Sequence, residues 1–456
     1  MSSRTASTRV ARALLLWLAV LVSEPVFAVE ASYFHDIRPI IQRQCQGCHQ
    51  PNLKSSNLDL TSYEGFQSGG KHGPASKTLL GYITGDSKPQ MPRGQPPLPA
   101  EQIELFRVWI AAGAKDDTPA EARENLSAAA PIVYTQPPVI NALAFSPDGK
   151  AFAVSGNREI LIHSLDGASA GSTPPRRLPG LADRILSLVF SKDGSALVAA
   201  GGTPARFGEI QIWDAGSGKL RRSLTLTGDT VFGASISPDA STVAVGCTDN
   251  SVRIVDAVSG QERFKIGNHE NWVLGTVFGV DGKRIVSVGR DRAAKLTDAA
   301  SGAFLENVNL LRGELAAIAR HPTKDIIVIG GDDRVPYIYT MDRGQNMKIA
   351  DDSTLIRKLE MQDGSIAALA WSPDGAHIAV GGASPEVTIY DAESGKRVAA
   401  CKGHRAGIYA VAFSPDGQTL ATGGFDGEVR LYRVTTGELA KQFIPVPITS
   451  DLRSQK

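Results

Sequence analysis

A short turn motif recurs along the carboxy-terminal two thirds of the chain and constrains the fold more than any other feature. Clear copies and one degenerate copy stand at residues 146–149, 191–194, 237–240, 280–282, 320–322, 372–375 and 414–417. Consecutive copies are about 42 to 51 residues apart, which is the repeat length of a propeller blade. One such unit cannot bury both of its faces alone, so the units must stack. The spacing predicts an all-β, seven-bladed propeller over residues 131–446.

Each copy has the same internal order of elements. In the last copy, an apolar run at 408–413 precedes a Ser-Pro-Asp-Gly turn, and a second run follows at 419–422. A Gly-x-Asp turn then leads to an alternating segment at 428–432. Short apolar or alternating runs joined by tight turns are typical of antiparallel strands. We expect ring closure to pair either residues 132–135 or residues 439–446 with the open edge of the last blade.

The repeats resemble WD repeats. Trp213-Asp214 is the one literal Trp-Asp pair, and Val255-Asp256, Thr297-Asp298 and Tyr390-Asp391 stand in its place elsewhere. The resemblance implies a structural His–Asp hydrogen bond in some blades, here His404 with Asp426 and His269 with Asp291. Cys247 and Cys401 fall in different blades, so we interpret both as small buried residues. Two insertions, at 202–208 and 341–357, are candidate docking loops.

A Cys-x-x-Cys-His segment near the amino terminus contains the residues best suited to bind a cofactor. The thiols of Cys45 and Cys48 can each add to a vinyl group of haem, and the imidazole of His49 can bind the iron. Such a pair can also hold zinc or act as a redox dithiol. Zinc would require a second ligand pair, and a dithiol enzyme would require a βαβ context that this segment lacks. The segment therefore predicts one covalently attached haem c.

Two helices are predicted around this segment. Apolar residues at positions 34, 37 and 41 share one helical face with Cys45, with Asp36 near the start and Pro39 in the first turn. A second helix is predicted over 99–112, with Ile103, Phe106 and Ile110 on one stripe and Trp109 beside it. Gly113 would end it. We expect this stripe to pack against the first helix.

The distal iron ligand is predicted to be Met91. It is the one methionine within residues 29–117, and it lies on a stiff, proline-rich loop at 88–93. A thioether opposite an imidazole stabilises ferrous iron, as electron carriers often require. His72 is the competing ligand, and His35 is a weaker competitor. Arg93 is a candidate partner for a haem propionate, although a solvated side chain is an equally good interpretation.

Further motifs give the segment a specific resemblance. They include Leu58-Asp59-Leu60, Gly73-Pro74-Ala75, Met91-Pro92 and Trp109-Ile110-x-x-Gly113-Ala114. Together with Cys45-x-x-Cys48-His49, these motifs resemble the planctomycete-type cytochrome c domain, a relative of class I cytochromes c, over about 85 residues. The resemblance implies a small all-α domain with haem on Cys45 and Cys48 and with His49 and Met91 on the iron. His72 departs from the family pattern, which leaves the distal ligand open.

The first 28 residues predict export. Three arginines precede an apolar run at 13–22, residues 23–25 interrupt that run, and small residues follow at 26–28. This is the order of a secretory signal peptide cut after Ala28, and the run is too short to span a bilayer. An uncleaved membrane anchor is the alternative. Haem c is attached outside the bacterial cytoplasm, so export to the periplasm and the haem motif support each other.

The composition excludes other classes of function. The chain has 456 residues and a net charge of +1, which gives no electrostatic case for nucleic acid or an anionic membrane. The predicted organisation is a signal peptide at 1–28, a cytochrome domain at 29–117, a linker at 118–130, the propeller at 131–446 and a tail at 447–456.

The sequence therefore predicts an exported single-haem electron carrier whose propeller docks redox protein partners. No catalytic constellation is visible in the propeller, so an enzyme is the less favoured interpretation. The alternatives are a propeller redox enzyme that uses the cytochrome as its electron outlet, and an assembly or sensor scaffold that contains haem.

Overall fold

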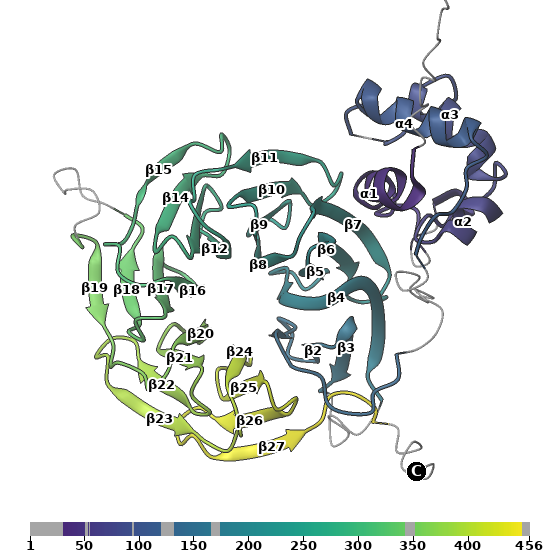
Figure 1. Cartoon of the computed structure of the whole chain (residues 1–456). Helices are drawn as coiled ribbons and strands as arrows, with labels where there is room; N and C mark the ends of the chain where they lie inside the picture. The colour runs from purple at the N-terminus through teal and green to yellow at the C-terminus, as the bar shows by residue number, and fades with distance from the viewer. Residues whose placement is uncertain are drawn as a thin grey trace, which may run out of the picture.

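The computed structural model describes residues 31–50, 53, 55–93, 95–119, 132–165, 174–342 and 352–448. The predicted signal peptide, nearly all of the predicted linker and most of the second insertion lie outside these ranges. The described chain forms a small helical part followed by a ring of β-sheets (Figure 1). No helix within the described ranges combines the length and the apolar character needed to cross a bilayer.

The helical part confirms both predicted helices and adds two α-helices and a short 3-10 helix that the sequence analysis missed. Its elements are η1 (Tyr33–Ile37), α1 (Arg38–Gln44), η2 (Ser55–Asn57), α2 (Tyr63–Ser68), α3 (Ala75–Thr84) and α4 (Ala100–Ala111). The hydroxyl of Ser32 accepts a hydrogen bond from the His35 amide at 2.9 Å, and the Asp36 carboxylate accepts one from the Ser32 amide at 2.7 Å. These reciprocal bonds satisfy amides that the start of a helix leaves unpaired.

One apolar core holds these helices together. Ile37 of η1, Ile41 of α1, Phe66 of α2 and Phe106 of α4 are buried within it. Trp109 is also fully buried and donates a hydrogen bond from its indole nitrogen to the Lys115 carbonyl at 2.9 Å. The predicted packing of the second helix against the first is therefore confirmed, because Trp109 of α4 stacks on Tyr33 of η1.

The ring consists of six hydrogen-bonded sheets. The first sheet contains β1 (Leu143–Phe145), β2 (Ala151–Ser155), β3 (Asn157–Ser164), β4 (Arg176–Phe190), β5 (Ala196–Thr203), β6 (Phe207–Asp214) and β7 (Leu220–Thr227). The second contains β8 (Val231–Ile236), β9 (Thr242–Cys247), β10 (Val252–Asp256) and β11 (Glu262–Ile266). The third contains β12 (Val273–Phe278), β13 (Arg284–Gly289), β14 (Ala294–Asp298) and β15 (Phe304–Asn307).

The remaining three sheets complete the ring in chain order (Figure 1). The fourth contains β16 (Leu315–Arg320), β17 (Ile326–Gly331), β18 (Tyr337–Thr340) and β19 (Leu355–Lys358). The fifth contains β20 (Ile366–Trp371), β21 (His377–Gly382), β22 (Val387–Asp391) and β23 (Arg397–Cys401). The sixth contains β24 (Ile408–Phe413), β25 (Thr419–Gly424), β26 (Val429–Arg433) and β27 (Leu439–Phe443).

The prediction of seven separate blades is corrected by the long strand β4. Its first residues pair with β3, where Leu178 lies opposite Ile160, and its last residues pair with β5, where Phe190 lies opposite Leu197. The strand thus ends one four-stranded unit and begins the next, which fuses two units into one seven-stranded sheet. Counting β4 in both gives seven four-stranded units arranged in six sheets.

The recurring turn is stabilised by its own side chains. In the first copy the Ser146 hydroxyl donates to the Asp148 carboxylate at 2.6 Å and accepts from the Ala151 amide at 2.8 Å. Gly149 adopts a φ of 71°, which favours glycine. In the degenerate copy the His321 ring replaces the serine, and its Nδ1 accepts from the Thr323 and Lys324 amides at 3.2 and 3.1 Å.

Of the two segments predicted to pair with the open edge of the last blade, the carboxy-terminal one does so. Strand β27 pairs with β26 at the outer edge of the sixth sheet, with Phe443 opposite Val429. The amino-terminal segment makes a single parallel bridge instead, between Tyr134 and Ile448. The Tyr134 hydroxyl also donates to the buried Glu159 carboxylate at 2.7 Å, which ties the start of the ring to β3.

A buried histidine lies at this closure. His163 of β3 is 4% exposed, and its ring lies edge-on to the ring of Phe443 at 5.3 Å between centroids. Burial lowers the pKa of His163 from 6.5 to about 4, and the nearby Lys441 charge adds to the shift. The folded protein therefore keeps this ring neutral at pH values where the unfolded chain would protonate it.

We expect acid to weaken the closure through His163. Its neutral form contributes stability that is complete above pH 6.5 and is lost as the pH falls from 6.5 towards 4. The loss should be on the order of 2 kcal/mol in the free energy of unfolding. Urea unfolding across this range should show a flatter pH dependence for His163→Gln than for the native protein. Equal slopes in the two proteins would contradict this role.

Candidate functional site

The end of α1 places the three residues of the Cys-x-x-Cys-His segment on one turn of chain. The Cys45 amide donates to the Ile41 carbonyl at 2.9 Å and so continues the helix. The amides of Cys48 and His49 then donate to the Cys45 carbonyl at 3.2 and 3.1 Å, which forms a tight turn. Both cysteines are free thiols. Local backbone hydrogen bonds therefore place all three groups within one turn of chain.

The surroundings of the thiols distinguish among the three predicted chemistries. Burial raises the pKa of Cys45 to about 12, and the neighbouring Cys48 adds to the shift. Partial burial also raises the pKa of Cys48, although this side chain keeps contact with solvent, and Arg222 of β7 opposes the shift. A redox dithiol needs the opposite shift, because its thiolate is the nucleophile. Within the described ranges, no three His, Cys, Asp or Glu side chains gather as zinc ligands would. The raised thiol pKa values therefore do not favour a redox dithiol.

His49 is held in a defined orientation. It is buried, and its Nδ1 lies 3.0 Å from the Ser55 carbonyl oxygen, which can only accept a hydrogen bond. Nδ1 therefore carries the proton, and the lone pair of the neutral ring lies on Nε2. Burial lowers the pKa of His49, against the opposing effect of the Ser55 hydrogen bond. A neutral imidazole whose other nitrogen donates to a carbonyl is the usual form of a metal-ligating histidine.

Met91 and its two competitors lie in different environments. Met91 is half-buried and packs against the same apolar core as Cys45, and its amide donates to the Tyr82 carbonyl at 2.9 Å. His72 and His35 are exposed. The His72 ring lies 5.7 Å from that of Tyr82, and the His35 ring 4.9 Å from that of Phe34. The structure thus brings Met91, rather than either histidine, to the core that Cys45 contacts.

These residues fit a c-type haem in their chemistry. Cys45 and Cys48 offer two free thiols three residues apart, His49 presents a neutral imidazole with Nδ1 engaged, and Met91 offers a thioether from the same apolar core. An apolar surrounding is what a largely apolar porphyrin requires. Arg93 is exposed, as a solvated side chain would be.

The ring of sheets contributes to the surroundings of this segment. Helix α1 packs on β7, the outer strand of the second four-stranded unit (Figure 1). A Cβ atom on Gly47 would lie 2.2 Å from the Ser223 carbonyl oxygen, so only glycine permits this approach. The Gln95 side chain donates to the Gly260 carbonyl at 3.3 Å. Sequence reasoning missed these contacts, because nothing local in β7 marks Ser223 or Arg222 as neighbours of Cys48.

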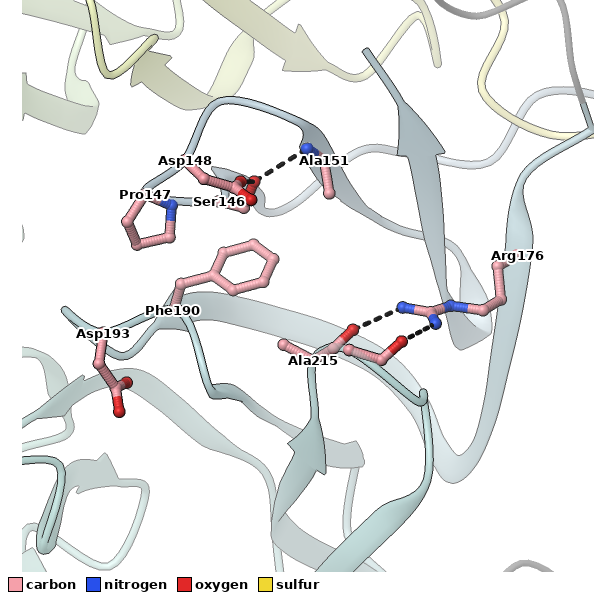
Figure 2. A pocket seen from close by; sticks show the side chains of 10 residues that line it. Ser146, Pro147, Asp148, Ala151, Arg176, Phe190, Asp193 and Ala215 are labelled. Atoms are coloured by element: carbon pink, nitrogen blue, oxygen red, sulfur yellow. Dashed lines mark hydrogen bonds between the residues drawn. The ribbon is translucent and has the colours of Figure 1, made fainter. Parts of the chain in front are cut away.

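A cavity of about 550 Å³ lies between the first two units, at their Ser-Pro-Asp-Gly and Ser-Lys-Asp-Gly turns. Pro147 and Phe190 give it an apolar wall, and Asp148 and Asp193 line it as well. Figure 2 shows Arg176 of β4 donating to backbone carbonyls, at 2.7 Å for Ala215 and 2.6 Å for Gly216. The lining of the cavity thus combines apolar and charged side chains.

Both predicted His–Asp pairs form in the ring, and each extends to a third residue. The Nδ1 atoms of His269 and His404 lie 2.9 Å from carboxylate oxygens of Asp291 and Asp426. Their Nε2 atoms lie 2.7 Å from hydroxyl oxygens, those of Ser287 and Thr422 respectively. Both histidine side chains are fully buried. Such closed networks are structural, because every polar atom of the ring is used within the fold.

Comparisons with known families agree with this arrangement. The WD domain, G-beta repeat, matches residues 218–256 and 395–433, and the latter segment contains the His404–Asp426 pair. The anaphase-promoting complex subunit 4 WD40 domain matches residues 319–409. The ring is a WD-repeat propeller. Cys247 and Cys401, predicted as small buried residues of this propeller, are both buried.

Several curated proteins are similar to the chain. An uncharacterised WD repeat-containing protein of Schizosaccharomyces pombe is 26% identical over 36% of the chain and 34% of its own length. Protein tipD of Dictyostelium discoideum is 23% identical over 62% of the chain and 50% of its own length. Transcription factor unc-37 of Caenorhabditis elegans is 29% identical over 44% of the chain and 31% of its own length. The chain thus spans a third to a half of these relatives.

These similarities define the propeller as a scaffold of a kind used for protein interactions. The matched family segments lie between residues 218 and 433, within the WD-repeat propeller. The haem, its ligands, the electron-transfer role and the export of the protein are proposals that depend on the helical part.

Proposed function

We propose that the chain is an exported, single-haem c-type cytochrome that transfers electrons, with the WD-repeat propeller as its docking scaffold for redox partners. The main support for the proposal is a set of groups suited to bind haem on one turn of chain and in the core beside it. Cys45 and Cys48 are free thiols, and His49 follows directly with an oriented, neutral ring. Met91 packs against the core that Cys45 contacts. Haem bound in this way would supply reversible one-electron transfer.

Each of these residues would have a separate role in binding the haem. Cys45 and Cys48 would bind it covalently, so that it cannot dissociate. The Ser55 carbonyl fixes the orientation of His49 and keeps the ligating nitrogen deprotonated. The apolar core around Ile41, Leu79 and Phe106 excludes water. Exclusion of water would lower the reorganisation energy of electron transfer. The proposed location is the periplasm, where haem attachment and the predicted signal peptide agree.

Expression in a bacterial host that matures c-type cytochromes tests the proposal. We expect the exported protein to retain haem after complete denaturation, with a mass equal to that of the chain from residue 29 plus one haem. We also expect it to be reduced and reoxidised reversibly. A polypeptide of unmodified mass, or one that carries zinc on its thiols, would refute the proposal and leave a propeller scaffold.

The distal ligand can be assigned with two matched substitutions. Met91→Ala should lower the reduction potential and change the absorption spectrum of the reduced protein, because a thioether stabilises ferrous iron. His72→Ala removes an exposed ring and should change neither property. Redox titration and optical spectra of both variants provide the measurement. The opposite result, with a change for His72→Ala and none for Met91→Ala, would assign His72 instead.

A further inference from the structure

Strand β7, which faces the Cys-x-x-Cys-His segment, carries Arg222, a cation that is bonded to neutral backbone acceptors. Arg222 of β7 is half-buried and precedes Ser223, whose carbonyl oxygen contacts Gly47. Its guanidinium donates to the carbonyls of Val258 at 3.0 Å and Arg221 at 2.9 Å. Within the described ranges Arg222 forms no ion pair with a carboxylate. Its charge is thus held in place by neutral acceptors.

This charge lies on the strand that contacts the turn between the two thiols. The approach of Gly47 to Ser223 sets β7 against the turn between Cys45 and Cys48. Arg222 directly precedes Ser223 on β7, and helix α1 packs on this strand, so its charge lies beside the contact. The neighbouring Arg221 is directed elsewhere, since it pairs with Asp214 and donates to the Ser195 carbonyl. Two adjacent arginines on one strand therefore have different partners.

We propose that the propeller completes the haem site, with β7 packed against the turn that carries the two thioether bonds and with Arg222 supplying a positive charge there. This inference rests on the proposed function, since it requires haem on Cys45 and Cys48. Oxidised haem carries one more positive charge than reduced haem, so a nearby cation favours the reduced state. The contact of β7 with this turn also displaces water there, which would otherwise stabilise the oxidised state. The reduction potential would then depend on the docking of the two parts.

Two pairs of matched variants test this inference in the full-length, haem-loaded protein. Arg222→Gln removes the cation, and Arg221→Gln is its neighbour on the same strand. Gly47→Ala places a methyl group against the Ser223 carbonyl, whereas Gly267→Ala places one where no atom lies within 4 Å. We expect Arg222→Gln and Gly47→Ala to shift the midpoint potential downward, and we expect the two controls to leave it unchanged. The shift for Arg222→Gln should shrink as salt is added.

Hydrogen exchange separates the charge from the contact. Gly47→Ala should accelerate exchange of the amides of β7 and α1, whereas Arg222→Gln should leave their exchange unchanged. If haem is attached but neither variant shifts the potential, the inference is wrong and the proposed function stands. If the native protein carries no covalent haem, the proposed function fails and the inference fails with it.

Discussion

A variant in which serine replaces both Cys45 and Cys48 will leave a cytochrome c maturation host without covalent haem. A hydroxyl cannot form the thioether bond that a thiol forms with a vinyl group, and no other cysteine lies in the helical part. The expected effect is complete loss of the haem that survives denaturation. Mass spectrometry of the exported protein, together with haem staining of denaturing gels, gives the measurement.

The propeller supplies the matched control for this experiment. Cys247 of β9 and Cys401 of β23 are fully buried free thiols in different sheets. Replacing both by serine removes the same number of sulfur atoms and should leave covalent haem at the native level. Each single variant, Cys45→Ser or Cys48→Ser, should retain one thioether bond and a reduced yield of attached haem. Native haem content in the double variant of Cys45 and Cys48 would exclude this attachment site.

The parts of the fold that the sequence predicted correctly depend on local interactions. The turns follow from side chains such as Ser146 and Asp148, which bond to each other and to the backbone within five residues. Helix α4 follows from an apolar stripe that begins after Pro99 and ends before Gly113. The Cys45–His49 segment is likewise closed by hydrogen bonds within its own turn. Short-range patterns of this kind can be read from one sequence.

The parts that were missed depend on contacts between distant residues. Helix α3 has an apolar face in Leu79 and Ile83, but its burial depends on Phe66 and Phe106 from other helices. Strand β4 looks like two strands in the sequence, and only its pairing with both β3 and β5 joins them. No repeat pattern reveals this shared strand, because the turn motif marks where units begin rather than how they pair.

The same division applies to the candidate site. Cys45, Cys48 and His49 were predicted from their spacing, and the structure gives His49 the tautomer that a ligand needs. Met91 was predicted from its rarity, and its place against the core distinguishes it from the exposed His72. Arg222 gave no signal, because a single arginine in a strand is ordinary until the opposite surface is known.

The largest effect on stability is expected from Asp426→Ala in the sixth sheet. The Asp426 carboxylate accepts from the ring of His404 at 2.9 Å and from the amides of Arg405 and Glu428 at 3.2 Å each. Burial opposes ionisation of Asp426, yet the hydrogen bond from His404 keeps its pKa below the ordinary value. Alanine would leave a buried ring nitrogen and two amides without their acceptor. Because a polar group that is buried without a hydrogen-bond partner is costly, we expect a loss of about 3 kcal/mol in the free energy of unfolding.

Two further substitutions give this expectation its controls. Thr422→Val keeps the shape of the side chain but removes the hydroxyl that lies 2.7 Å from the His404 Nε2, so it should cost about 1 kcal/mol. Asp363→Ala removes an exposed carboxylate and should change stability by less than about 0.5 kcal/mol. Urea unfolding should rank the three variants in this order, and hydrogen exchange should place the loss for Asp426→Ala in β24, β25 and β26. An Asp426→Ala protein as stable as Asp363→Ala would mean that the network does not hold the sixth sheet together.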